Sequence, residues 1–196
     1  LILQKDGKHY VVDCGGDSGE TAANRAIGIL HSQGVFRLDG LIVTHYDDDH
    51  AGGVSQLLSK VPADTVYMPV FTGESSLRDE ISCAYEDRIC WVKHDMVLED
   101  TPITIYPSAD TSDDNESSLC VLFQSEDCDI LITGDRSNDG ELALMAHTDL
   151  PDLEILIAGH HGSDDSTSWE LLNKTRPELV IISVGKDNAY GHPNWE

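Results

Sequence analysis

Four apolar stretches of this chain lead into histidine or aspartate, a fifth leads into a polar loop that holds His192, and this feature limits the folds that the sequence can adopt. Short apolar runs of this kind are typical of buried β-strands. A chain that needed only a solvated surface would not keep ending such strands in these side chains. The polar groups that follow the runs are Asp13, the segment from His45 to His50, Asp135, His160 with His161, and His192. We expect the fold to bring these strand ends together at one edge.

The segment LIVTHYDDDHAGG, residues 41–53, holds the densest of these clusters. It places three consecutive aspartates after a buried strand in a chain whose formal net charge is already −24. Burying a carboxylate costs several kcal/mol unless the carboxylate is paired. No lysine or arginine lies between Arg37 and Lys60. The segment therefore predicts that a cation bound from solution is the missing partner.

Strand alternation gives each residue of this segment an expected direction. His45, Asp47 and Asp49 occupy alternate positions and would share one face, so Asp48 would point away into solvent. Asp13 precedes Cys-Gly-Gly, and either a turn-forming role or a role in the site is open for it. The five clusters taken together are not explained by structural roles alone.

Hairpins and strand–helix–strand units occur in both halves of the chain. This pattern predicts one domain over residues 1–196, of the α/β (α+β) class: a four-layer αββα sandwich with two mixed sheets and helices outside. Asp6-Gly7 is the expected turn of the first hairpin. We expect strands over 1–4, 9–13, 38–45, 65–70, 101–107, 118–124, 128–135, 153–157 and 178–185. We expect helices over 19–34, 52–61, 75–89, 138–148 and 166–175, and an exposed loop over 108–118.

The charge balance argues against tight binding of nucleic acid by surface charge alone, because 36 acidic residues face 12 lysines and arginines. Most of these acids are expected to form a solvated surface. The five cysteines have no CxxC spacing. Cys83 could pair with Cys90, and Cys120 with Cys128, or all could be simple thiols.

The ends of the chain and its apolar runs bear on its origin. No stretch approaches 18 consecutive apolar residues, and no signal peptide is present. The chain opens without Met and stops at GHPNWE. We expect it to be a piece excised from a longer protein.

The residues at the strand ends offer imidazole nitrogen and carboxylate oxygen. Such a mixed donor set suits Zn²⁺ or Mn²⁺ and does not suit a metal that prefers thiolates. Asp135 is distant in sequence from His50 but also follows a strand. A carboxylate in such a position can bridge two metal ions, as in many two-metal hydrolases.

Three motifs match a known family. THYDDDHAGG resembles the signature T-H-x-H-x-D-H-x-G-G of the metallo-β-lactamase superfamily, with Asp47 in place of the second histidine. DILITGD and ILIAGHHGS resemble the next metal motif and the late histidine motif of that superfamily. NESSLCVLF, HHGSDDSTSWELL and ISVGKDNAYGHP together resemble the C-terminal domain of ComEC-type DNA-uptake competence proteins.

The resemblance implies a site that holds two divalent ions, Mn²⁺ or Zn²⁺, with Mg²⁺ as a third candidate. It assigns Asp49 and His50 to one ion, His45 and Asp47 to the other, Asp135 to both, His160 as the last metal-binding histidine, and His161 as a ligand or proton donor. The superfamily usually has another histidine in the loop before the GD strand. That loop here offers Asp113, Asp114, Asn115 and Ser118, which would shift the preference towards Mn²⁺ or Mg²⁺.

The function implied by the resemblance is a metal-dependent phosphodiester hydrolase, a nuclease that acts on DNA during competence-related uptake. Its partners would be the transmembrane channel domain of the same parent chain and other competence proteins. Its location would be the outer side of a bacterial cytoplasmic membrane. In this reaction Asp49, His161 and His192 would be catalytic, with His161 or His192 protonating the leaving oxygen. Substrate contacts would come from Ser163, Asn188 and Asn115.

Two alternatives stay open. A hydrolase of small phosphodiesters, like a phosphorylcholine esterase, could use Trp91, Trp169 and Trp195 to cage a quaternary ammonium group. A module without catalysis could bind metal for stability and handle DNA for the channel. Activity with and without Asp49 would separate the enzyme from the module. The superfamily name alone does not indicate a β-lactamase activity.

Overall fold

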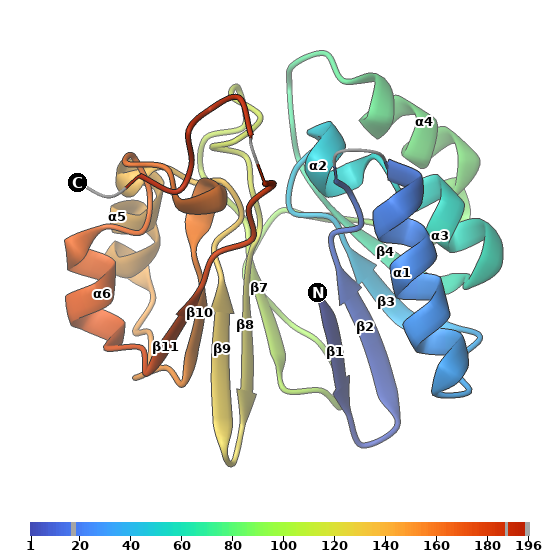
Figure 1. The fold of residues 1–196 in the computed structure, drawn as a ribbon, viewed down its shortest axis with the longest axis horizontal. Coiled ribbons are helices and arrows are strands. Elements are labelled where there is room, and N and C mark those ends of the chain that lie inside the picture. The colour runs from blue at the N-terminus through green and yellow to red at the C-terminus, as the bar shows by residue number, and fades with distance from the viewer. Residues whose placement is uncertain (17–18, 187, 195–196) are drawn as a thin grey trace. The chain divides into compact units, whose positions relative to one another are not determined.

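The computed structural model describes residues 1–16, 19–186 and 188–194, which form two compact units, Leu1–Lys93 and His94–Glu196. Each unit is built around one mixed β-sheet with helices packed against it (Figure 1). A single domain over both units stays a prediction. In the described part of the chain, no helix has the length and apolar character needed to cross a membrane.

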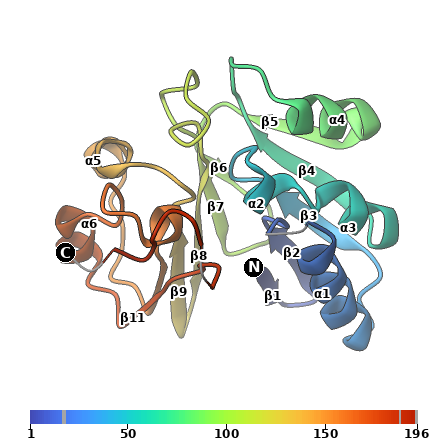
Figure 2. The same cartoon turned by 45° about the horizontal axis from the view of Figure 1, so that its top comes forward.

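The first unit contains a five-stranded sheet. Its order is β1-β2-β3-β4-β5, with bounds Ile2–Lys5, Lys8–Val12, Leu38–Ile42, Ala63–Pro69 and Ile89–Val92. The β1–β2 pair is antiparallel and the other pairs are parallel. The same side of this sheet carries the helices α1 (Gly19–Ser32), α3 (Val54–Lys60) and α4 (Ser76–Ala84) (Figure 2). Leu41, Leu57 and Met68 belong to the buried core of this unit.

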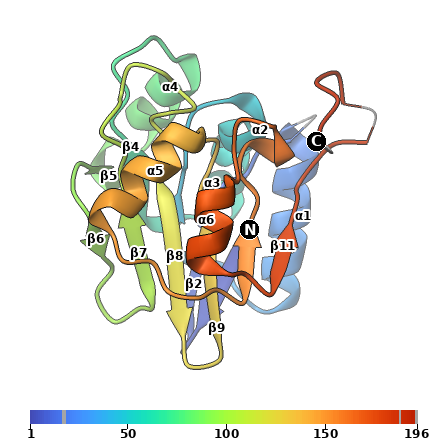
Figure 3. The ribbon, with the colours of Figure 1, turned by 90° about the vertical axis from the view of Figure 1, so that its left-hand side faces the viewer.

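The second unit contains a six-stranded sheet. Its order is β11-β10-β9-β8-β7-β6, with bounds from β6 to β11 of Met96–Val97, Ile103–Tyr106, Cys120–Ser125, Cys128–Ile132, Ile155–Ile157 and Leu179–Ile181. Strands β6 to β9 pair antiparallel, and β9, β10 and β11 pair parallel. Two helices, α5 (Asn138–His147) and α6 (Trp169–Thr175), lie against one face of the sheet (Figure 3).

The parallel strands explain why the polar clusters gather. In the first unit the carboxyl ends of β2 and β3 lie side by side, and the Asp13 N–H donates to the Ile42 carbonyl (2.9 Å). In the second unit β9, β10 and β11 run in the same direction, so the segments that follow them meet at one edge. Within each unit, the expectation that strand ends converge is therefore confirmed.

Some expected elements differ from the structure. The helix expected over 75–89 ends at Ala84, followed by a 3₁₀ turn over Glu86–Arg88 and then by β5. Strands as short as β5 and the two-residue β6 leave too weak a periodicity to detect. The strand expected up to His45 ends at Ile42, and a short helix, α2 (Asp48–Ala51), follows. The alternation predicted for 45–49 is therefore wrong, because a helix begins within that segment.

All five cysteines are free thiols. Cys120 and Cys128 begin β8 and β9, and the register of this hairpin places Cys128 opposite Ser125 at the far end of β8. The disulfide considered for that pair is therefore not formed. Burial raises the pKa of the Cys120 thiol to about 11, and likewise that of Cys14. These two thiols are protonated core residues.

Candidate functional site

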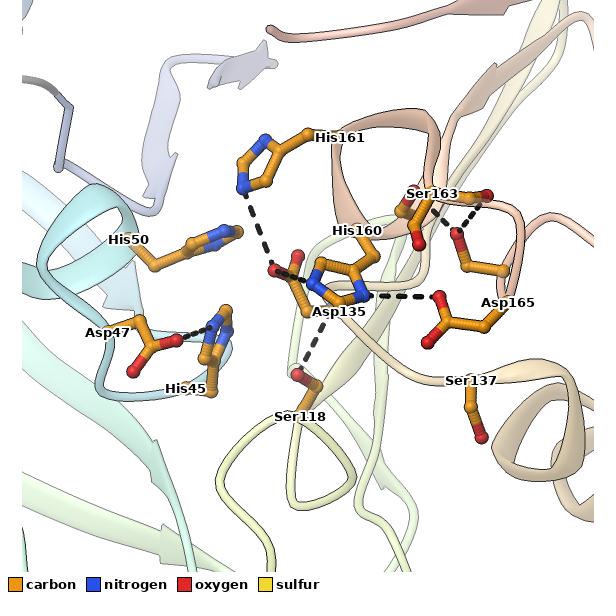
Figure 4. Close-up of polar contacts among 12 residues, drawn as sticks. His45, Asp47, His50, Ser118, Asp135, Ser137, His160, His161, Ser163 and Asp165 are labelled. Atoms are coloured by element: carbon orange, nitrogen blue, oxygen red, sulfur yellow. Dashed lines mark hydrogen bonds and ion pairs between the residues drawn. The ribbon is translucent and has the colours of Figure 1, made fainter. Parts of the chain in front are cut away.

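The first unit holds two buried imidazoles in the segment after β3. The rings of His45 and His50 lie 4.0 Å apart between centroids (Figure 4). The segment is anchored to β4, since Val43 N–H donates to the Tyr67 carbonyl (3.0 Å) and the Tyr46 hydroxyl to the Pro69 carbonyl (2.6 Å). These two bonds fix the backbone of the segment beside β4 on either side of His45.

Asp13 organises both imidazoles. Its Oδ1 accepts from Thr44 N–H (2.7 Å), and its Oδ2 accepts from Thr44 Oγ1 (2.7 Å) and from His50 Nδ1 (2.8 Å). Because the Thr44 hydroxyl donates to Asp13, its oxygen can accept from His45 Nδ1 (3.2 Å). Both rings thus carry hydrogen on Nδ1, and Nε2 is the nitrogen that can ligate a metal. Asp13 has this positioning role in addition to its left-handed backbone conformation (φ 55°).

The charge of Asp13 supports this assignment. Burial alone would raise the pKa of this carboxyl, but the electrostatic attraction and the hydrogen bond of the His50 ring, with the Thr44 amide, lower it overall. An ionised carboxylate is a pure acceptor. The hydrogen of each Asp13 contact therefore comes from its partner, as the tautomers above require.

Asp47, Asp48 and Asp49 are all exposed, which agrees with the solvent-facing direction expected for Asp48 and corrects the expectation of burial for Asp47 and Asp49. Asp47 is the N-cap residue of α2, and Asp48 and Asp49 form its first turn, where negative charge is favoured by the helix dipole. Oδ2 of Asp47 lies 3.8 Å from Nε2 of His45. Asp48 and Asp49 are both exposed, so exposure does not single out Asp48 as the aspartate that points away from the site.

Gly15 is a site residue that the sequence motifs did not single out. A Cβ at this position would collide with the backbone of α2. The neighbouring Cys14 accepts at its carbonyl from Gly53 N–H (2.6 Å) and donates its own N–H to the His50 carbonyl (2.8 Å). The Asp13-Cys14-Gly15 segment therefore holds α2 in place, and the small residues after Asp13 were the available signal.

The second unit brings Asp135 together with two further imidazoles. Asp135 is buried, and its Oδ2 lies 3.6 Å from His161 Nε2 and 4.0 Å from His160 Nε2 (Figure 4). His161 Nδ1 donates to the Ser183 carbonyl (2.8 Å), and His160 Nδ1 faces Oδ1 of Asp165 (3.3 Å). An acceptor at Nδ1 thus fixes the orientation of each ring, while Nε2 faces Asp135.

This arrangement fits a cation. A carbonyl oxygen only accepts, so His161 carries hydrogen on Nδ1, and the same holds for His160 beside the Asp165 carboxylate. In their neutral forms both rings then direct an Nε2 lone pair towards the Asp135 carboxylate. Two lone pairs beside a carboxylate oxygen repel one another unless a positive charge lies among them. Imidazole nitrogen and carboxylate oxygen are also the donors that Zn²⁺ and Mn²⁺ accept.

The turn that carries these imidazoles is strained. His160 (φ 43°), His161 (φ 54°) and Gly162 (φ 81°) are three consecutive left-handed residues. This conformation costs a non-glycine residue roughly 1–2 kcal/mol. The turn is held because the His160 N–H donates to the Gly134 carbonyl (3.2 Å) and Ser166 Oγ donates to the Gly159 carbonyl (2.8 Å). Strain of this kind is characteristic of functional sites.

Three buried residues support the turn and Asp135: Ser118, which the sequence analysis named only as a loop residue near the metal site, and Arg136 and Glu141, which the motifs did not reveal. Ser118 Oγ accepts from Asp135 N–H (3.1 Å). The fully buried Arg136 donates from Nε to the Ser118 carbonyl and from Nη2 to the Tyr106 carbonyl, both at 2.8 Å. Glu141 accepts from the N–H groups of Thr167 (2.7 Å) and Ser168 (2.8 Å). Burial raises the pKa of Glu141, although these hydrogen bonds and the charge of Arg136 oppose the shift.

The loop after β11 carries His192 and Asn188. The His192 ring lies 5.7 Å from the His160 ring between centroids. Nδ2 of Asn188 donates to the carbonyls of Gly185 (3.1 Å) and His192 (2.7 Å), and Oδ1 accepts from the N–H groups of Tyr190 (3.2 Å) and His192 (3.0 Å). These four bonds use the whole capacity of the amide. A phosphate contact by Asn188 would require breaking one of them.

The two other residues predicted to contact substrate, Ser163 and Asn115, both belong to the second unit. Ser163 follows the histidine turn, and its N–H donates to the His160 carbonyl (2.9 Å). The Asn115 carbonyl accepts from Ser118 N–H (3.0 Å). Their substrate contacts stay predictions. Of the tryptophans considered for an aromatic cage, Trp91 and Trp169 belong to different units, and Trp195 lies outside the described residues.

The sequence comparisons agree with the motifs. The metallo-β-lactamase superfamily model matches residues 1–88. ComE operon protein 3 of Bacillus subtilis is 32% identical over 175 residues, which cover 86% of this chain and 23% of that protein. Competence protein ComA of Neisseria gonorrhoeae is 31% identical over 198 residues, covering 98% of this chain and 26% of that protein. The chain thus spans about a quarter of the length of the curated relatives it matches.

The structural comparison confirms the predicted fold class. The metallo-β-lactamase fold protein YhfI from Bacillus subtilis matches with a TM-score of 0.52 at 15% sequence identity, covering 80% of this chain and 61% of that protein. At this identity the match concerns the fold alone. The shared framework is therefore two mixed sheets flanked by helices.

Proposed function

Because the chain has the metallo-β-lactamase fold and is homologous to ComEC-type competence proteins over most of its length, we propose that it is a metal-dependent phosphodiester hydrolase that cleaves DNA during competence-related uptake. The observation that carries this proposal is the convergence of two imidazole lone pairs on the buried Asp135. Neutral rings and a carboxylate in this arrangement call for a bound cation.

Two divalent ions, Mn²⁺ or Zn²⁺ with Mg²⁺ as a third candidate, are the proposed cofactors. The donor chemistry described above fits them, and the proposed ligands are His45, Asp47, Asp49, His50, Asp135 and His160. Bound ions of this kind activate water at neutral pH and neutralise charge on phosphoryl oxygens.

The residues of the chain supply proton transfer and positioning. The Ser183 carbonyl fixes one hydrogen of His161 on Nδ1, so Nε2 is the atom that either binds the cation or, when it is itself protonated, gives a proton to the leaving oxygen. His192 is the second candidate donor, since its ring is adjacent to that of His160. Asp49 is the proposed catalytic carboxylate of the first unit, and Ser163 and Asn115 are the proposed contacts to substrate.

The proposed setting is a larger membrane protein. The relatives named for competence are about four times longer than this chain. A domain with a net charge of −24 repels a polyanion, so a channel domain of the same parent would have to deliver the strand. The other proposed partners are further competence proteins, and the proposed location is the outer side of the cytoplasmic membrane.

The test is cleavage of labelled DNA by metal-stripped protein to which Mn²⁺, Zn²⁺ or Mg²⁺ is added in turn. We expect cleavage that needs the metal, and a loss of about 100-fold or more in Asp49→Ala. The matched control is Asp48→Ala, which removes the adjacent exposed carboxylate of the same helix turn and should retain activity.

Other outcomes would replace the proposal. Turnover of bis-p-nitrophenyl phosphate without any cleavage of DNA would favour a hydrolase of small phosphodiesters. If metal binds and neither substrate is cleaved, a non-catalytic module that handles DNA becomes the better account. Equal loss in the two aspartate variants would show a general effect of charge near α2.

Replacing Asp13 with asparagine should weaken metal binding by about 10- to 100-fold, the usual cost of losing a group that orients a metal-binding histidine. An amide N–H₂ towards His50 would favour the tautomer with hydrogen on Nε2, which cannot ligate. Metal affinity is measured by competition with a chelating dye. Asp39→Asn is the control, because Asp39 also accepts two hydrogen bonds in this unit but contacts Lys8 and His9. Unchanged affinity in Asp13→Asn would refute the orienting role.

A further inference from the structure

Tyr190 is an aromatic side chain that the fold leaves in solvent. It is 83% exposed, the highest fraction among the large apolar and aromatic side chains of the described residues. One face of its ring stacks on His192, with centroids 5.8 Å apart and an angle of 10° between the planes. Offset-stacked aromatic pairs are favourable contacts, and such a contact needs one uncovered face. The face turned away from His192 is therefore open to a planar partner.

The backbone around Tyr190 is fixed. The four hydrogen bonds of the Asn188 amide join Asn188 to Gly185, Tyr190 and His192, and one of them accepts from the N–H of Tyr190 itself. Asn194 N–H donates to the Gly162 carbonyl (2.9 Å), and a Cβ on Gly162 would crowd Pro193. The segment with the exposed ring is thus tied to the turn that carries His160 and His161. A rigid aromatic loses little conformational entropy when it binds.

The rings form a path from this exposed position to the candidate site. Tyr190 stacks on His192, whose ring lies 5.7 Å from that of His160. His160 Nε2 in turn lies 4.0 Å from the Asp135 carboxylate. A ligand stacked on Tyr190 would therefore lie at the rim of the site, on the face of the ring turned away from His192.

We propose that Tyr190 is a stacking platform for a nucleobase of single-stranded DNA next to the phosphodiester that is cleaved. This inference rests on the proposed function and names the form of its substrate. Every base offers a π-face, so the contact tolerates any sequence. Bases in a duplex are already stacked on their neighbours, so a single strand is favoured. Stacking also adds affinity without positive charge, which suits a chain with a net charge of −24.

The experiment compares Tyr190→Ala and Tyr190→Phe on two single strands of equal length, one of thymidines and one without bases. For Tyr190→Ala we expect KM for the thymidine strand to rise about ten-fold or more, with kcat unchanged. The strand without bases should show no change, and Tyr190→Phe should behave as the unaltered protein. Phe36→Ala is the control, because Phe36 is also an exposed ring (64%) beside a histidine but lies in the first unit.

A second readout separates this inference from the proposed function. Fluorescence anisotropy measures binding of the labelled strands to the Asp135→Asn variant, with and without Tyr190→Ala. If the unaltered protein cleaves no DNA, the proposed function fails, and a base-dependent loss of binding on Tyr190→Ala still supports the platform. Unchanged KM and binding for the thymidine strand, or an equal loss with both strands, would overturn it. Because the side chain is exposed, the melting temperature should not change.

Discussion

Replacing Asp135 with asparagine is expected to reduce phosphodiester hydrolysis by about 10³-fold or more while the second unit stays folded. The carboxylate lies within 4.0 Å of Nε2 of both His160 and His161, and the two lone pairs make it the centre of negative charge in this cluster. A bound cation contributes several kcal/mol to stabilising the charge that develops in the reaction, which corresponds to this factor. An asparagine amide would donate to the imidazoles and take the place of that cation.

The measurement is kcat/KM for a single-stranded oligonucleotide and for a small phosphodiester, together with the circular dichroism of each variant. Asp164→Asn is the matched control, since Asp164 is exposed in the loop after the histidine turn and should retain full activity. Activity within ten-fold of the unaltered protein in Asp135→Asn would contradict the placement of the cation at this carboxylate. A collapse of the dichroism would instead show that Asp135 is needed for folding.

The part of the site that sequence could predict is the part that follows strands directly. Asp13, Asp135 and His161 were identified because an apolar run that ends in a titratable side chain is a local pattern. The parallel order of the strands then brings such residues together within each unit. The direction of the side chains at 45–49 was not predictable from alternation, because three acidic residues at a helix start have the same local composition as a polar strand end.

The supporting residues could not be predicted because their partners are main-chain groups distant in sequence. In the sequence, Arg136 comes directly after the candidate ligand Asp135 and cannot be told from an ordinary surface arginine. In the structure, its guanidinium donates to the carbonyls of Tyr106 and Ser118. Glu141 occupies the first turn of a helix, where an acid is ordinarily explained by the dipole. Every residue has a main-chain carbonyl, and every residue except proline has an N–H. The sequence therefore does not show which of these groups a side chain will bind.

Replacing Arg136 with methionine is expected to lower the free energy of unfolding by about 3–5 kcal/mol, the range seen when one partner of a buried charge network is removed. The carbonyls of Tyr106 and Ser118 would lose their donors in a buried environment. Glu141 would also lose the positive charge that favours its ionised form. Methionine keeps most of the buried volume, so the decrease in the free energy of unfolding would come mainly from lost polar interactions and not from a cavity.

The pH dependence and a matched arginine distinguish this network from a general loss of charge. Burial raises the pKa of Glu141, so the folded state binds a proton more tightly than the unfolded state, and stability falls as pH rises above the usual range of a carboxyl. Without Arg136 that fall should be steeper between pH 5 and neutrality, measured by urea unfolding. Arg176→Met removes an arginine that contacts Asp152 in solvent, and it should lower the free energy of unfolding far less than Arg136→Met, with no added pH dependence. Equal costs for the two variants would mean that the buried guanidinium supports Asp135 and the histidine turn no more than a surface ion pair does.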